Sequence, residues 1–268
     1  MYAGQRLIAQ DGYEVALFPM ADMYLTQGEY GSVSHDLAMD FQGWSNGQRV
    51  YQCPYYAPFS CTCVRAGGSG ENYRIFTSDT PVHCADGGFS VLTFVVMHDN
   101  NPIANEGDHF TQGDLIGHSG TARPAGTQPM GDHLHLNVAW GGYAGWSPTS
   151  YGPPYYELTN SIHIYDGLYV NDTILTVDGG YNWRTYTGPT PPPPPTPDEK
   201  KHRFPWVLYA RKFRNRRGGL TNYFSSSIIK SYLLNDLTDY FSRVIYKKSR
   251  LFKSTLFVCM YPIIKTYL

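Results

Sequence analysis

Lysine is missing from most of this 268-residue chain, and the first lysine is Lys200. Long apolar runs are missing as well: no stretch of 18 or more apolar residues occurs, which excludes a membrane-spanning helix. The first residues contain neither a basic segment nor an apolar one, so we expect no signal peptide. A protein of this kind that acts outside a cell would need a route other than its own leader.

Cysteine is scarce, and its spacing does not match a zinc knuckle. The chain has five cysteines, an odd number, and no C-x-x-C pair. Free thiols packed within β-structure are the favoured interpretation, and a disulfide among the first four is the alternative. The five residues are Cys53, Cys61, Cys63, Cys84 and Cys259.

Charged residues are also few, at 16%, whereas turn formers and tyrosine are abundant. Glycine and proline together make up about 17% of the chain, compared with an average of roughly 12%. Tyrosine contributes 23 residues, more than phenylalanine and tryptophan together. This composition favours strands and turns over long helices, and it excludes collagen, coiled coil and disorder of the whole chain.

A proline run divides the chain into two parts of opposite charge. Residues 1–187 are predicted to form a β-rich domain, residues 188–197 a stiff polyproline II linker, and residues 198–268 a separate tail. Up to residue 197 there are 6 arginines and 18 acidic residues, a net charge of −12. The remainder has 15 basic and 4 acidic residues, a net charge of +11, which indicates a different function.

The basic tail has the pattern of a surface-binding segment. Residues 200–217 are basic with interleaved aromatics, and residues 228–252 have apolar positions at helical spacing between lysines and arginines. We therefore predict a basic amphipathic helix that contacts an anionic envelope or a virion partner. A disordered solubilising extension is the alternative. Nucleic-acid binding has charge and aromatics in its favour but no motif, so no specific nucleic-acid partner is expected.

Three segments of the acidic part read as strands. Residues 48–67 predict two strands around a turn at 57–60, and residues 88–99 are a continuous apolar run typical of a buried strand. Residues 133–140 alternate, which places His133, His135 and Asn137 on one face and apolar side chains on the other. The fold is therefore expected to be mainly antiparallel β with long loops.

The H-L-H sequence within the last strand suggests a metal site. On a strand, residues i and i+2 share a face about 6.5–7 Å apart, so both imidazoles can converge on one ion. Zinc binds histidine nitrogen and carboxylate oxygen, and catalytic zinc sites use three protein ligands. His35 and Asp40 are candidate partners, because a strand beginning near residue 38 returns Asp40 towards the same ion. Asp36 directly follows His35, so its side chain should point elsewhere.

These elements occur in an order that resembles a known family. His35 and Asp40 come first, then YAPFSCTCVRAG, then a strand that ends in Met97 and His98. FTQGDLIGHSG (110–120) and DHLHLNV (132–138) follow. Together they resemble the M23 zinc metallopeptidases, the lysostaphin and LytM-like family, over about residues 19–140. The resemblance implies an antiparallel β-sheet metallopeptidase fold.

The resemblance also implies a role for each matching residue. His35, Asp40 and His135 match the zinc ligands, while His98 and His133 match the two catalytic histidines. A two-histidine, one-carboxylate set leaves an open position for water on zinc. The two catalytic histidines would act as general base and as donors to the tetrahedral oxyanion.

Three positions depart from the family pattern or match it loosely. His35 and Asp40 are five residues apart instead of four, so the intervening loop must bulge. Asn137 replaces a common acidic residue, and zinc binding would weaken if that acid supports a ligand. Tyr30 corresponds loosely to a tyrosine that reaches the oxyanion in the family. The loop at 143–156 either walls a substrate groove or is a plain aromatic surface loop.

We therefore predict a zinc-dependent endopeptidase that cuts the peptide stems or cross-bridges of bacterial peptidoglycan. The proline linker, the basic tail and the absence of a signal peptide favour a bacteriophage lysin, carried in the virion or released from the host cytoplasm by lysis. The alternative is a catalytically degenerate structural or binding module of a phage tail. The presence of all five residues of the predicted site favours the enzyme.

Overall fold

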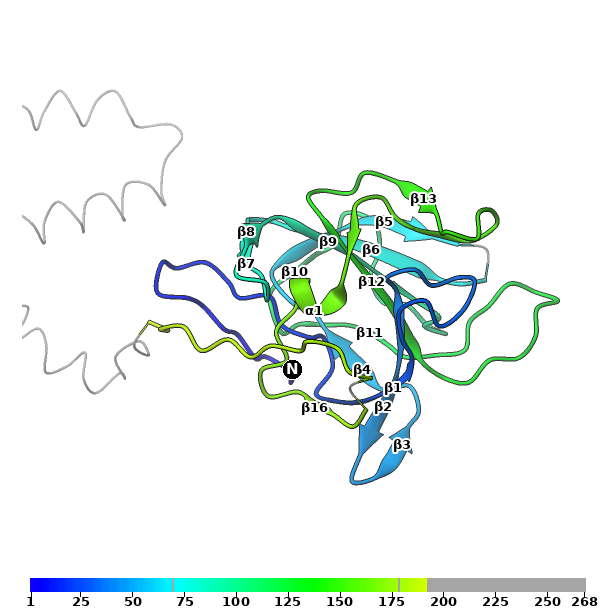
Figure 1. Ribbon diagram of the computed structural model, residues 1–268, viewed down its shortest axis with the longest axis horizontal. Coiled ribbons are helices and arrows are strands. Elements are labelled where there is room, and N and C mark those ends of the chain that lie inside the picture. Colours follow the sequence, from blue (N-terminus) through cyan, green and yellow to red (C-terminus); the bar gives the residue numbers. More distant parts are fainter. Residues whose placement is uncertain (69, 178, 192–268) are drawn as a thin grey trace, which may run out of the picture. The chain divides into compact units, whose positions relative to one another are not determined.

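The computed structural model describes residues 1–68, 70–177 and 179–191, and this part of the chain consists of β-strands joined by long loops (Figure 1). Helix within it is limited to α1 (Ile164–Gly167). The mainly β class predicted from composition is therefore confirmed. The predicted tail at 198–268, its helix at 228–252, Cys259 and most of the proline linker lie outside the described residues.

A ten-stranded sheet forms the centre of the fold. The strand order is β10 (His109–Phe110), β5 (Cys61–Gly67), β6 (Tyr73–Ser78), β9 (Leu92–Met97), β12 (Leu134–Trp140), β2 (Met39–Ser45), β1 (Asp22–Gln27) and β16 (Ile174–Leu175). Neighbouring strands are antiparallel, except for β1 and β16, which pair in parallel at the edge of the sheet. In addition, β15 (Ser161–Ile162) pairs with β12, and β3 (Gln48–Val50) pairs with β2.

Three small two-stranded sheets accompany the central one. They are β4 (Pro54–Tyr56) with β11 (Leu115–His118), β7 (Val82–His83) with β8 (Phe89–Ser90), and β13 (Trp146–Pro148) with β14 (Tyr156–Leu158). The predicted turn at 57–60 does separate two strands, β4 and β5, but these strands belong to different sheets. A turn pattern marks where a strand ends without indicating its partner.

The central strands are buried on both faces. On one face of β12, Leu134, Leu136 and Val138 pack into the main core. On the other face, Ala139 belongs to a second core cluster with Leu158 of β14. The β13–β14 hairpin therefore covers the sheet face on which the H-L-H residues were predicted to lie.

The described cysteines agree with the sequence prediction. Cys53, Cys61, Cys63 and Cys84 are free thiols, and the last three are buried. This matches the interpretation of thiols packed in β-structure. No helix in the described part of the chain is long and apolar enough to cross a membrane. One compact unit covers Met1–Pro193.

Candidate metal centre

Strand pairing brings Asp40 and His135 together. Asp40 is the second residue of β2 and lies directly opposite His135 of β12 in the antiparallel ladder. Directly opposed residues on one face have Cβ atoms about 4.5–5.5 Å apart, close enough for their side chains to meet. The carboxylate Oδ1 of Asp40 lies 3.0 Å from Nδ1 of His135.

His35 completes a cluster of three possible metal ligands. Its Nε2 lies 3.1 Å from Nδ1 of His135 and 3.4 Å from Oδ1 of Asp40. His35 and His135 are both buried. The three ligand atoms therefore lie at the corners of a small triangle, although they come from the loop before β2, from β2 and from β12.

The dimensions of this triangle fit a zinc ion. Ligand atoms 2.0–2.1 Å from a tetrahedral zinc lie about 3.3–3.4 Å from one another. The observed separations of 3.0, 3.1 and 3.4 Å are close to this value. Two imidazoles and one carboxylate are also the ligand types that zinc prefers, and they leave a fourth position open.

The cluster favours a deprotonated Asp40 and a neutral His135. Burial alone would raise the pKa of the Asp40 carboxyl, but hydrogen bonds from His135 and His35 outweigh it and hold this pKa far below its ordinary range. Burial lowers the pKa of His135, which keeps the imidazole neutral. A deprotonated carboxylate and neutral imidazole are the forms that bind metal.

His98 and His133 lie beside the cluster. The rings of His98 and His133 are 4.6 Å apart, and the ring of His98 is 5.9 Å from that of His135. Nε2 of His133 lies 3.6 Å from Oδ2 of Asp40. The absence of a side chain at Gly120 lets the backbone of His98 lie against it, because a Cβ atom at Gly120 would overlap the carbonyl oxygen of His98. The structure thus brings together five of the six predicted site residues.

The two ends of one loop orient both of these histidines. Nδ1 of His98 is 2.8 Å from the carbonyl oxygen of Ala122, and Nδ1 of His133 is 2.7 Å from that of Gly131. A carbonyl oxygen only accepts, so each Nδ1 carries a proton, and in the neutral ring the lone pair is then on Nε2. His98 also has a φ of 77°, a left-handed conformation that is uncommon for a residue other than glycine. Burial, followed by the neighbouring histidines, lowers the pKa of His98 to about 3.

Glu157 was not recognised from the sequence, although it holds the loop between His35 and Asp40. Its carboxylate accepts hydrogen bonds from the backbone N–H groups of residues 36, 37 and 38 at 2.7–3.1 Å. The predicted bulge in this five-residue gap therefore wraps around a buried carboxylate. Burial raises the pKa of Glu157, although the three N–H groups oppose this effect. Glu157 lies about 120 positions away and belongs to no motif, so no sequence signal indicated it.

Asp36 points away from the cluster, as predicted. Its carboxylate accepts hydrogen bonds from the backbone N–H and the hydroxyl of Ser150, both at 2.7 Å. In addition, the hydroxyl of Thr149 donates to the carbonyl oxygen of Val33. The 143–156 loop thus holds the His35 loop in place.

Asn137 fastens one hairpin to the central sheet. Its Oδ1 accepts hydrogen bonds from the backbone N–H of Leu158 and the hydroxyl of Ser161. Among the described residues, its buried Nδ2 has no hydrogen-bond partner. The asparagine thus connects the β13–β14 hairpin to β12, and these hydrogen bonds go to the hairpin region instead of to the predicted ligands.

Tyr30 is not oriented by the cluster. Its side chain is 64% exposed, and within the described residues no hydrogen bond of its hydroxyl is found. It lies with a φ of 54° in the loop between β1 and β2, the same loop that carries His35. Its predicted contact with an oxyanion remains a prediction.

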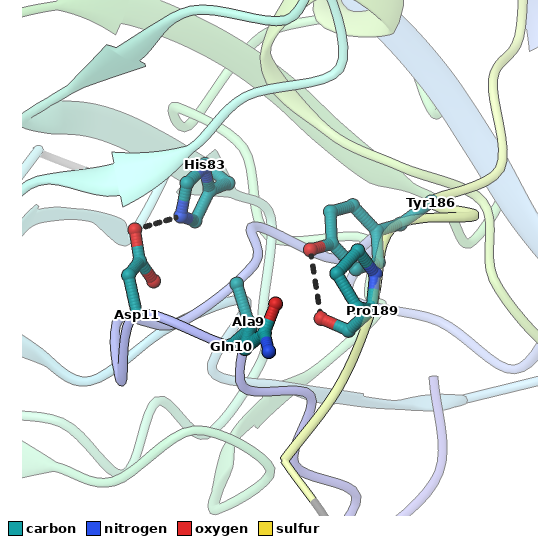
Figure 2. Close-up of a pocket in the computed structure, with 6 residues that line it drawn as sticks. All are labelled: Ala9, Gln10, Asp11, His83, Tyr186 and Pro189. Carbon is teal, nitrogen blue, oxygen red and sulfur yellow. Dashed lines mark hydrogen bonds and ion pairs between the residues drawn. The ribbon is translucent and has the colours of Figure 1, made fainter.

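Three other histidines pair with carboxylates. His83, His109 and His163 contact Asp11, Asp79 and Glu29, respectively. The pair His83–Asp11 borders an open pocket of about 390 Å³ (Figure 2). None of the predicted site residues lines this pocket, whose lining residues are Ala9, Gln10, Asp11, His83, Tyr186 and Pro189.

One relative of this chain is a bacteriophage protein. The chain is 41% identical over 177 residues to Morphogenesis protein 1 of Bacillus phage B103, a match that covers 65% of this chain and 45% of the relative. The chain thus spans less than half the length of that relative. No protein-family model matches the chain.

Solved structures that are similar over about half of the chain include two peptidases. The catalytic domain of the antimicrobial peptidase lysostaphin from Staphylococcus simulans has 24% identity and a TM-score of 0.30, over 50% of this chain and 81% of that domain. A zinc-containing peptidase from Vibrio cholerae has 18% identity and a TM-score of 0.34, over 50% of this chain and 43% of that protein.

Proposed function

We propose that this protein is a zinc-dependent peptidoglycan endopeptidase of a bacteriophage, which cuts peptide stems or cross-bridges of the bacterial cell wall. The observation that carries the proposal is the convergence of His35, Asp40 and His135, with His98 and His133 beside them. Three ligand-type side chains, an open fourth position and two adjacent imidazoles are what metal-assisted hydrolysis of an amide bond requires.

The ligands proposed for zinc are Nε2 of His35, Oδ1 of Asp40 and Nδ1 of His135. When bound there, zinc would polarise the scissile carbonyl and acidify the attacking water. Asp40 has a second function within the chain, because its other oxygen, Oδ2, faces Nε2 of His133. One carboxylate therefore links the ligand cluster to a proton-carrying side chain.

His98 and His133 would divide the handling of protons. Nε2 of His98 presents a lone pair, and its low pKa disfavours the protonated ring, which suits a residue that orients water by accepting a hydrogen bond. Asp40 lies beside His133 and stabilises that ring when it is protonated. His133 would therefore take the proton from water, donate to the oxyanion while charged, and deliver the proton to the departing amine.

The phage relative supports a role in the virion. Its name refers to morphogenesis, which favours a protein built into the particle over one that acts only at lysis. A wall-cutting enzyme in a phage particle would open the envelope locally. The basic tail at 198–268 would then contact an anionic envelope or another virion protein.

The test combines wall digestion with metal analysis of the full chain. Purified peptidoglycan should release muropeptides whose masses identify the cut bond, and a chelator should stop the reaction until zinc is restored. His135→Ala should lose most of its zinc, whereas Asp36→Ala, which alters the neighbouring loop, should keep it. Full zinc content in His135→Ala would refute the ligand assignment. Zinc binding without release of any muropeptide would instead favour the degenerate structural module.

A further inference from the structure

One polar side chain outside the ligand triangle touches the far ring nitrogen of His35. The amide of Gln27 lies 3.2 Å from Nδ1 of His35 and 2.6 Å from the hydroxyl oxygen of Ser32. Gln27 is the last residue of β1, where the register with β2 shifts after Leu25, so that Gln27 pairs with Asp40. Such a bulge redirects a side chain. The same short segment therefore lies beside two of the proposed ligands.

The metal geometry requires one tautomer of His35. Its Nε2 faces Asp40 and His135, so this atom must offer the lone pair. A neutral imidazole with a free Nε2 carries its proton on Nδ1, and that N–H needs an acceptor. Within the described residues, the Gln27 amide is the hydrogen-bonding group found at this position.

The amide of Gln27 can supply this acceptor. The structure has Nε2 of Gln27 facing His35, and a half-turn of the amide places Oε1 there. The hydroxyl of Ser32 can donate to Oε1 as well as accept from Nε2, so its contact of 2.6 Å with the Gln27 amide fits either orientation. With Oε1 in place, Ser32 and His35 both donate to it. The Ser32 oxygen can still accept from the hydroxyl of Ser34, 2.9 Å away.

We propose that Gln27 is a positioning residue for the metal ligand His35. Its amide oxygen accepts the Nδ1 proton of His35 and thereby keeps the Nε2 lone pair directed at the metal. The inference rests on the zinc site proposed above. Partners of this kind fix the orientation of a ligating histidine, and their loss typically reduces metal affinity by about 10–100-fold.

The test measures zinc affinity of the full chain by competition with a chromophoric chelator. Gln27→Met, which keeps the length of the side chain but cannot accept strongly, should raise the Kd for zinc by about 10–100-fold. Gln27→Glu should keep the Kd near the wild-type value, because a carboxylate accepts the Nδ1 proton at least as well. Gln48→Met, at an exposed position of β3, is the control and should change nothing.

The glutamate variant separates this role from a merely structural one. If the amide of Gln27 acts as a donor, Gln27→Glu should lose zinc as Gln27→Met does, and that result would overturn the proposal. An unchanged Kd in Gln27→Met would overturn it too. Because either variant can disturb folding, ¹⁵N NMR of histidine in the zinc-loaded wild type gives an independent result: His35 must carry its proton on Nδ1, and a proton on Nε2 contradicts the proposal.

Failure of the zinc site itself gives a different outcome. If the wild-type chain binds no zinc, both the proposed function and the role of Gln27 are wrong. If wild type binds zinc and His135→Ala does not, while Gln27→Met binds normally, the metal site stands and only the positioning role fails.

Discussion

Removing the carboxylate of Glu157 should destabilise the loop that joins His35 to Asp40. Glu157→Leu leaves the buried N–H of Ala38 without an acceptor, which costs about 1–3 kcal/mol. The N–H groups of Asp36 and Leu37 are half-buried and can turn to water, so each loses about 0.5–1.5 kcal/mol. The sum is about 2–6 kcal/mol. Release of a buried carboxylate offsets part of it, and we expect a net loss of about 2–4 kcal/mol.

Urea unfolding of the metal-free full chain measures this loss. The midpoint should fall without a change in the slope against urea, because the surface exposed on unfolding stays nearly the same. Glu157→Gln should lose less, since one oxygen can still accept all three N–H groups. Glu106→Gln removes an exposed charge and should stay within about 0.5 kcal/mol of wild type.

The loop joins two proposed ligands, so zinc binding should weaken as well. A relaxed loop must be ordered again when the metal binds, and we expect the Kd for zinc of Glu157→Leu to rise by about tenfold, the low end for such partners. A loss of stability below about 1 kcal/mol together with an unchanged Kd would refute the reasoning. It would mean that the β13–β14 hairpin covers the loop without holding it.

Three further predictions concern the histidines and the tail. His98→Ala and His133→Ala should keep zinc yet lose wall-digesting activity by about 10²-fold or more; if His133→Ala loses its zinc, the roles within H-L-H are exchanged. The buried, neutral His98 binds a proton less readily than it does in the unfolded chain, so the stability of the metal-free protein should decrease as pH falls from 6.5 to about 3. In His98→Asn this dependence should be flatter by up to about 1.4 kcal/mol per pH unit, and an identical profile would contradict the assignment. A chain of residues 1–187 should hydrolyse soluble peptidoglycan fragments as fast as the full chain. It should bind intact cells less tightly than the full chain, and this difference in binding should shrink in high salt. Loss of hydrolysis would mean that the tail completes the catalytic domain.

Local patterns in the sequence predicted the mainly β fold class, which the structure confirms, and the family resemblance predicted the site residues. Apolar runs and turn residues act over a few positions, so the turn at 57–60 could be found without knowing its strands' partners. The run predicted as one strand at 88–99 is instead divided into β8 (Phe89–Ser90) and β9 (Leu92–Met97), which belong to different sheets. The order of the motifs related His35, Asp40 and His135 to one family pattern, and the structure places these residues together. The outward direction of Asp36 also followed from the alternation of an extended chain.

Only the tertiary structure identified the groups that hold these residues in place. Glu157 acts on a loop about 120 positions earlier, and the carbonyl groups that orient His98 and His133 belong to the backbone, which carries no residue signal. Gln27 reaches His35 because a bulge shifts the register of β1, a feature that the residue pattern does not show. Asn137 occupies the position of a family acid yet fastens a hairpin. Residue types that can bind a metal are visible in a sequence, whereas their orientation depends on long-range contacts that arise only when distant segments pack together.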